Sequence, residues 1–214
     1  NGVTKDYSEA TKWFRMAAKK GNVDAVNRLG VMYHDGLGVP KDYAEAAKWF
    51  HAAADKGVAT AMRNLGKMYY EGNGVTKDYS EATKWFRMAA QKGNVDAMNR
   101  LGVMYHDGQG VPRDYSEALK WYRKAVEKGN AWAMFNLGMM YTDGQGVPKD
   151  YSEAFKWYRK AAEKGNASAM YNLGLMYRDG KGVLKDMQKA AVWFVKAAKL
   201  GNEDAKKEVG GNLP

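Results

Sequence analysis

Cysteine is absent from the 214 residues, which excludes disulfide bonds and thiolate metal sites. No apolar run approaches the ~20 residues that a membrane-spanning helix needs. A charged stretch followed by an apolar one, typical of a secretory signal, is also missing. The chain opens on Asn1-Gly2-Val3, which matches the loop Asn73-Gly74-Val75. We therefore expect a piece of a longer array, for which a missing signal does not indicate the compartment.

Tryptophan and glycine recur with a fixed spacing of 36 residues and no insertion or deletion. A period of this length predicts a solenoid, because each unit can bury its apolar face only against its neighbours. We expect one all-α domain over 1–214, with units near 1–24, 25–60, 61–96, 97–132, 133–168 and 169–204 and a short terminal helix at 203–209. The markers are Trp13, Trp49, Trp85, Trp121, Trp157 and Trp193, with Gly21, Gly57, Gly93, Gly129, Gly165 and Gly201.

Each repeat contains a tryptophan-containing helix. In the first unit, Asp6 followed by Glu9 predicts an N-cap and a capping box. Tyr7 and Phe14 then fall on one apolar stripe with three alanines. Gly21 is the expected stop, giving a helix of about 14 residues.

A second helix follows, with Asn22 as its expected cap and Ala25, Leu29 and Tyr33 on its buried side. A glycine lies inside this helix in all six units, although it costs about 1 kcal/mol relative to alanine. We expect a neighbouring helix to pass too close there for a Cβ, so that a substitution such as Gly102→Ala destabilises the fold. The positions are Gly30, Gly66, Gly102, Gly138, Gly174 and Gly210.

A Gly-x-Gly loop closes the second helix, as in Gly36-Leu37-Gly38. Its glycines supply positive φ, and the proline at position 40 discourages further helix. The loop lacks the Gly-Lys-Ser/Thr and the flanking strand of a phosphate-binding loop. We interpret it as a turn.

The net charge of +10 suggests acidic partners. However, lysine recurs in register along every unit, as at Lys12, Lys48, Lys84, Lys120 and Lys156, which indicates the solvated face of a solenoid. Nucleic-acid binding is therefore disfavoured against protein binding.

No group of residues indicates catalysis, a cofactor or a metal. Of the three histidines, His34 and His106 lie two units apart, on the order of 20 Å for helices about 10 Å wide, too far to share a metal ion. His51 lies on the other helix of its unit. No Ser/His/Asp or Cys/His grouping is marked out, so we expect a protein that is not an enzyme.

The repeat resembles the Sel1-like repeat, a branch of the tetratricopeptide-like solenoids. One instance runs from Ala97 through Leu101, Gly102, Tyr105 and Trp121 to Gly129, and the likeness covers nearly the whole chain. The resemblance implies a right-handed α/α superhelix of about six 36-residue repeats. Its Leu-Gly-x2-Tyr helices would line the concave face and its tryptophan helices the convex face. It also implies a soluble, non-catalytic adaptor from a bacterium, located in the periplasm, secreted or in the cytoplasm.

Consider the leucine of the Leu-Gly-x2-Tyr pattern in each repeat. The residues two and five positions before it, and two and five positions after it, should face the concave groove. They vary between units while the framework does not, as expected of a recognition surface. An alternative is that these side chains pack as ordinary core, or are covered by another copy or by the rest of a longer protein. The candidates are Trp132, Phe135, Met139, Tyr171, Leu175 and Arg178, the basic stretch Arg63, Lys67 and Tyr70, and Asn99 and His106.

Three functions compete. The first is a scaffold that binds a partner protein or peptide in the groove, with aromatic and arginine anchors supplying most of the affinity. A narrower form is an inhibitory or immunity protein that neutralises a secreted bacterial effector. The third is an electrostatic binder of nucleic acid or of an anionic envelope polymer. The sequence leaves the oligomeric state open.

Overall fold

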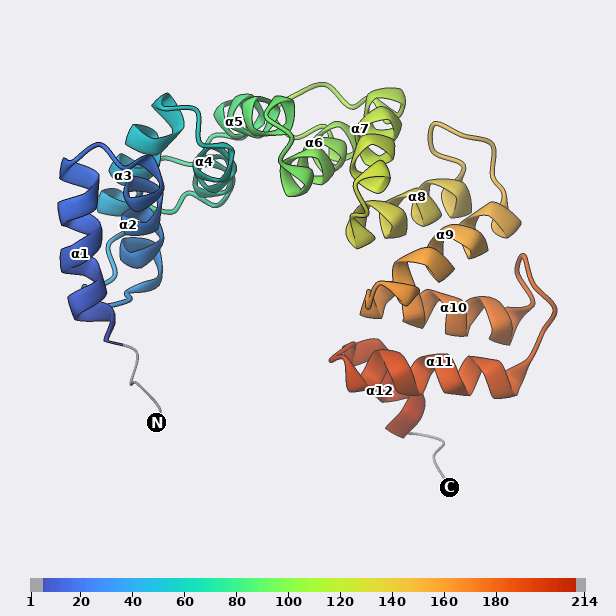
Figure 1. Cartoon of the computed structure of the whole chain (residues 1–214). Coiled ribbons are helices and arrows are strands. Elements are labelled where there is room, and N and C mark those ends of the chain that lie inside the picture. The colour runs from blue at the N-terminus through green and yellow to red at the C-terminus, as the bar shows by residue number, and fades with distance from the viewer. Residues whose placement is uncertain (1–5, 211–214) are drawn as a thin grey trace. The chain divides into compact units, whose positions relative to one another are not determined.

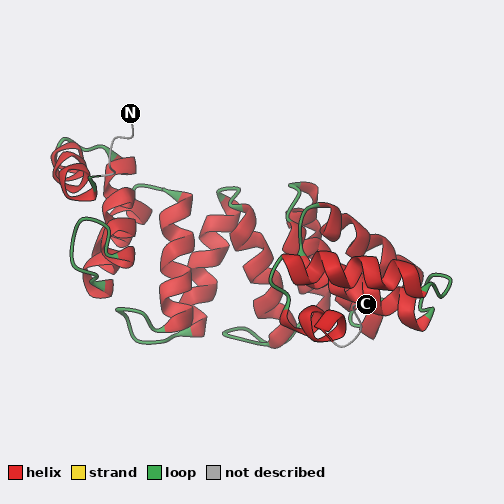
Figure 2. Ribbon diagram, turned by 90° about the horizontal axis from the view of Figure 1, so that it is seen from below, coloured by secondary structure: helices red, strands yellow, loops and turns green. Residues whose placement is uncertain are grey.

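The computed structural model describes residues 6–210. This range holds twelve helices joined by loops and no strand (Figures 1 and 2). The chain divides into two units, residues 1–114 and 115–214, which are described separately. The first unit contains α1 (Tyr7–Lys19), α2 (Val23–Asp35), α3 (Tyr43–Asp55), α4 (Ala59–Glu71), α5 (Tyr79–Gln91) and α6 (Val95–Asp107). The second contains α7 (Tyr115–Glu127), α8 (Ala131–Asp143), α9 (Tyr151–Glu163), α10 (Ala167–Asp179), α11 (Met187–Lys199) and α12 (Glu203–Gly210).

Helices pack against their neighbours in chain order within each unit, so the predicted all-α solenoid of helix pairs is confirmed. We call the odd-numbered, tryptophan-containing helices outer helices and the even-numbered ones inner helices. Except for α12, each helix has 13 residues, and the outer helices are thus close to the predicted length of about 14.

Aspartates cap the outer helices, as predicted. In α3, Asp42 Oδ1 accepts a hydrogen bond from the Glu45 N–H at 2.9 Å. The second hydrogen bond predicted for the capping box, from the Asp42 N–H to the Glu45 carboxylate, is wrong. The Asp42 N–H donates instead to the Tyr33 carbonyl at 2.9 Å, and the Glu45 carboxylate pairs with Lys48 at 3.0 Å. The backbone of the preceding inner helix therefore takes the donor that a capping box would use.

The outer helices end in Schellman motifs. At the end of α1, the Gly21 N–H donates to Ala18 O at 2.9 Å and the Asn22 N–H to Ala17 O at 3.0 Å. Gly21 has a φ of +84°, which glycine adopts without strain. The predicted glycine stop is thus confirmed, and it turns the chain directly into the next helix.

Asparagines cap most inner helices. Asn22 Oδ1 accepts from the Ala25 N–H at 2.9 Å, and Ala25 and Leu29 are buried as predicted. Tyr33 is only half-buried, because its hydroxyl reaches the surface and accepts a hydrogen bond from Arg15. Met32 is buried beside it, at 5% exposure.

Close helix crossings explain most of the mid-helix glycines. A Cβ on Gly30 would lie 2.6 Å from the Phe50 ring, and one on Gly66 2.7 Å from the Phe86 ring. Gly138 and Gly174 meet Tyr158 and Phe194 in the same way. The explanation is wrong for Gly210, where no atom of the described residues lies within 4 Å of an added Cβ.

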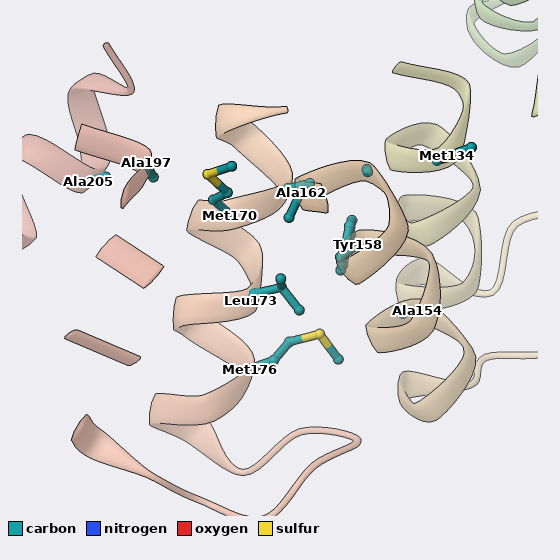
Figure 3. Packing of buried hydrophobic residues seen from close by; sticks show 11 residues of the cluster. Met134, Ala154, Tyr158, Ala162, Met170, Leu173, Met176, Ala197 and Ala205 are labelled. Atoms are coloured by element: carbon teal, nitrogen blue, oxygen red, sulfur yellow. The ribbon is translucent and has the colours of Figure 1, made fainter. Parts of the chain in front are cut away.

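The core of the second unit lies between its inner and outer helices. Leu173 and Met176 of α10 point toward α9, which carries Tyr158 and Ala162 (Figure 3). Leu173 is fully buried and Tyr158 is 2% exposed. This packing fixes the helices and leaves one side of each inner helix available for other contacts.

The last inner helix, α12, has a polar surface where the others are apolar. Lys206 occupies the repeat position of the buried Met62, Met98, Met134 and Met170, and it pairs with Glu203 at 2.7 Å.

Candidate functional site

A groove lies between the inner helices α2 and α4 of the first unit, with the Phe50 ring of α3 among its lining. We call it the α2/α4 groove; its volume is about 660 Å³. Seven of its residues are positions predicted from the repeat pattern to face inward: Asp24, Asn27, Val31, His34, Thr60, Arg63 and Lys67. Of the partner-binding candidates predicted from the sequence, the groove contains Arg63 and Lys67.

Two polar atoms in the groove lack hydrogen-bond partners. Asn27 Oδ1 is a buried acceptor on α2, and Arg63 Nε is a buried donor on α4; neither is bonded within the described residues 6–210. Buried polar groups are normally satisfied, so an unbonded pair in one groove requires an explanation.

The ion pairs of the groove differ in their distances. On α4, Arg63 Nη2 lies 4.0 Å from Asp96 Oδ2, and Lys67 Nζ lies 3.8 Å from Glu71 Oε1. Both separations exceed an ordinary charge-assisted hydrogen bond of about 2.7–2.9 Å. On α2, by contrast, His34 Nδ1 is 2.5 Å from Asp35 Oδ1.

The other candidates in the first unit do not line this groove. The Tyr70 hydroxyl donates to Gln109 Oε1 at 3.0 Å, and its ring lies 5.1 Å from that of Tyr79, so it is tied to the next repeat. Asn99 and His106 lie on α6, where His106 Nδ1 is 2.6 Å from Asp107 Oδ1.

The aromatic candidates of the second unit are divided between surface and core. Trp132 is 56% exposed, with its ring centroid 6.0 Å from that of Phe135. Phe135 also lies 5.7 Å from the Tyr158 ring, and Tyr171 lies 5.6 Å from the Phe194 ring. Phe135, Met139 and Tyr171 are partly buried against the core cluster, so core packing accounts for much of their position.

A smaller cavity of about 160 Å³ lies beside Leu175, lined also by Thr142, Tyr158 and Asn172. Tyr158 is buried there, which raises the pKa of its hydroxyl, and that hydroxyl lies 3.1 Å from Thr142 Oγ1. The hydroxyl therefore stays neutral and acts as a hydrogen-bonding group.

Arg178 is already committed to neighbouring carboxylates. Its Nε donates to Asp179 Oδ1 and its Nη1 to Glu208 Oε1, both at 2.9 Å. The hydrogen bond from Arg178 lowers the pKa of Asp179 and raises that of Arg178 itself. Arg178 thus ties α10 to α12 and has fewer donors left for a ligand than Arg63.

The groove also contains residues that the repeat positions did not predict: Arg28, Asp35, Phe50 and Asn64. Phe50 could have been found from the mid-helix glycines, because the ring that crosses Gly30 lies beneath the groove. Between residues 6 and 210, no three histidine or acidic side chains are arranged to hold a metal ion. No helix in that range is long and apolar enough to cross a membrane.

Comparison with known proteins gives consistent matches. The Sel1 repeat family model matches six segments: residues 1–22, 23–58, 59–94, 95–130, 133–166 and 167–202. A Sel1 repeat protein from Oxalobacter formigenes is 43% identical, with a TM-score of 0.91 over 96% of this chain and 84% of that protein. A comparison with curated proteins gave no match.

Two further solved structures are similar. The protective antigen c5321 of uropathogenic Escherichia coli, described as an SLR fold, is 44% identical with a TM-score of 0.88. The match covers 99% of this chain but 45% of that protein, so the chain spans less than half its length. The immunity protein PA5088 from Pseudomonas aeruginosa is 26% identical, with a TM-score of 0.57 over 88% of this chain and 69% of that protein. With six repeats matched in register along nearly its whole length, the chain belongs to the Sel1 repeat family.

Proposed function

We propose that this protein is a non-catalytic scaffold that binds a segment of a partner protein along its inner helices. The observation that carries the proposal is the α2/α4 groove, which gathers seven inward positions of two repeats on a constant framework. Leu29 and Leu65 hold that framework and are both fully buried. A rigid scaffold with variable exposed positions is suited to protein recognition.

The candidate residues outside the groove belong to the same proposal as secondary contacts. In the second unit, Trp132 is the best placed, because more than half of its side chain is exposed. Large aromatic side chains frequently anchor protein interfaces. Phe135, Met139, Tyr171 and Leu175 would support Trp132, whereas Tyr70, Asn99, His106 and Arg178 would border the binding surface.

An immunity or inhibitory role is a second candidate. It is supported by the 26% identity to the immunity protein PA5088 over most of this chain. In this role the bound segment would belong to a toxic effector. Co-expression of the chain with effectors encoded beside it should relieve their toxicity, and failure to relieve any of them argues against this role.

Electrostatic binding of nucleic acid has less support. Lysines of the outer helices pair with glutamates one turn earlier, as Lys48 does with Glu45 at 3.0 Å and Lys84 with Glu81 at 2.8 Å. Lys156 pairs with Glu153 at 2.6 Å in the second unit. These carboxylates offset part of the positive charge that a phosphate backbone would need.

Photocrosslinking tests the scaffold proposal. A photoreactive amino acid replaces the exposed Thr60 at the groove or, as a control, the exposed Ala52 on an outer helix. In lysate of the source cells, we expect a discrete protein to crosslink at position 60 and not at position 52, at moderate salt. Equal crosslinking at both positions, or crosslinking at position 60 that is lost when moderate salt is present during irradiation, would count against the inner helices as the binding surface.

A further inference from the structure

We propose that the α2/α4 groove binds an extended acidic peptide segment, with a carboxylate held by Arg63 and Lys67 and a main-chain N–H held by Asn27. This inference rests on the proposed scaffold function and adds the chemistry of the bound segment. It follows from the long ion-pair distances of Arg63 and Lys67, from the two buried atoms without hydrogen-bond partners in residues 6–210, Arg63 Nε and Asn27 Oδ1, and from the volume of the groove.

The donors come from one face of α4. Arg63 and Lys67 are four residues apart, so their side chains lie one helical turn apart on the same surface. Their nearest carboxylates are 4.0 and 3.8 Å away, and one of these, Asp96, is 66% exposed. Such pairs are weak, so a ligand carboxylate can bind both cations at shorter distances.

Other inner helices differ from α4 in the residues that they carry and in how these residues are paired. Arg178 of α10 donates hydrogen bonds to two carboxylates at 2.9 Å each, whereas Arg63 makes no hydrogen bond of that length within the described part of the chain. At the repeat positions of Arg63 and Lys67, α2 carries Asn27 and Val31. The basic pair is thus a local property of α4 and is not needed to build an inner helix.

Asn27 of α2 lines the groove. Asn27 Oδ1 is buried without a donor, and Arg63 Nε is buried without an acceptor. An extended peptide offers both missing groups, since each of its residues has an N–H and a C=O that are free of internal hydrogen bonds. A glutamate or aspartate in the segment adds the charge that Arg63 and Lys67 favour.

The groove has the room and the lining for such a segment. Its volume of about 660 Å³ lies within the usual range for ligand sites, roughly 300–1,000 Å³. Val31 is half-buried and supplies apolar contact for aliphatic side-chain atoms, whereas Phe50 is 1% exposed and lies beneath the groove. Two carboxylates of α2, Asp24 and Asp35, also line the groove, so we place the acidic group of the ligand on the α4 side.

Selection from a displayed library of random ten-residue peptides tests the inference. For wild type we expect enrichment of peptides with glutamate or aspartate. A synthetic copy of a selected peptide should bind at least tenfold more weakly when its acidic residue is replaced by glutamine or asparagine. Its affinity should also fall as salt rises.

The matched variant is Arg63→Asn/Lys67→Val, which gives α4 the residues that α2 already carries and so keeps the fold. We expect it to lose the preference for acid over amide while melting like wild type. Lys48→Met/Lys84→Met removes the same charge from outer helices and should keep the preference. Arg63→Lys retains the charge but removes Nε and should bind with intermediate affinity.

The outcomes separate this inference from the scaffold proposal. If selected peptides crosslink at position 60 but bind equally well with glutamine, the acidic specificity is wrong and the scaffold proposal stands. If no peptide is selected, or a single-stranded oligonucleotide binds more tightly and depends on Arg63 and Lys67, the inference is overturned. Crosslinking of a partner protein at position 60 then decides the scaffold proposal separately.

Discussion

The ring of Phe50 lies 2.6 Å from the place that a Cβ on Gly30 would occupy, although the two residues belong to different helices. A separation this short cannot be maintained with a methyl group present. The glycine therefore permits α2 and α3 to approach closely. The same relationship joins Gly66 to Phe86, Gly138 to Tyr158 and Gly174 to Phe194.

Gly66→Ala should destabilise the protein even though alanine is the better helix former. The helix-propensity gain of up to about 1 kcal/mol is outweighed by overpacking against Phe86, which typically costs about 1–3 kcal/mol. Urea unfolding followed by circular dichroism measures the difference.

Gly210→Ala is the control for this substitution. Among residues 6–210, nothing lies within 4 Å of a Cβ at that position, so we expect unchanged or slightly higher stability. If the two alanine variants shift stability alike, close packing is not the reason for the mid-helix glycines.

The N-terminus of α4 offers a stabilising substitution. Val58 is the N-cap and makes no side-chain hydrogen bond, whereas Asn94 caps α6 with a hydrogen bond of 2.9 Å to the Ala97 N–H. Their backbone conformations match: Val58 has φ −72° and ψ 107°, and Asn94 has φ −68° and ψ 114°.

Val58→Asn should therefore raise the free energy of unfolding by about 1 kcal/mol, because it supplies the missing cap. Chemical denaturation of the purified protein measures this gain. Val58→Ala is the control, since it removes the valine without adding an acceptor. A gain equal to that of asparagine would show that capping is not the cause.

The sequence predicts the helices well because each boundary depends on local chemistry. An aspartate or asparagine cap and a glycine stop lie within a few residues of the atoms that they satisfy, as Asn22 and Gly21 do. The prediction of the second capping-box hydrogen bond was wrong because that bond depends on a contact with another helix. The donor of Asp42 is taken by Tyr33 of another helix, which local spacing does not reveal.

Seven of the positions chosen from the repeat pattern line the α2/α4 groove, but the sequence did not predict which section would form that cavity. The aromatic section around Phe135 and Tyr171 attracts attention in the sequence, yet those rings pack onto Tyr158 and Phe194 and fill the space. Asn27, Val31 and Thr60 are short, so they leave the α2/α4 groove open. Cavity volume depends on how side chains fold over one another, which periodicity does not show.

Trp132 and Phe135 should differ in their effects on stability. Because Trp132 is 56% exposed, Trp132→Ala should change the free energy of unfolding by no more than about 0.5 kcal/mol. Phe135 is half-buried against Tyr158, so Phe135→Ala should cost about 2 kcal/mol, below the loss for a fully buried phenylalanine.

Urea titration of both single variants compares the two costs directly. A loss for Trp132→Ala as large as that for Phe135→Ala would assign Trp132 to the core and remove it from the candidate surface. The small loss that we expect makes Trp132→Ala suitable for binding experiments, whereas variants of Phe135 require a check of folding.

Acidification should weaken the start of α11 through Asp186. The Lys189 backbone N–H, and then its side chain, hydrogen-bond to the Asp186 carboxylate and lower its pKa below the ordinary value of 3.8. A carboxyl group whose pKa is lower in the folded state stabilises that state above its unfolded pKa. This contribution is lost as the pH falls through the folded pKa, so we expect stability to decrease below about pH 4.

Asp186→Asn should reduce this pH dependence without removing the cap, since asparagine is a comparable N-cap residue. Thermal unfolding from about pH 5 to pH 2 should give a shallower loss of stability for the variant than for wild type. Lys189→Met keeps the backbone hydrogen bond but removes the ion pair, so its slope should lie between the two. If Asp186→Asn follows the wild-type curve, the acid sensitivity arises from other carboxylates, and the charge of Asp186 contributes nothing measurable to the stability of α11.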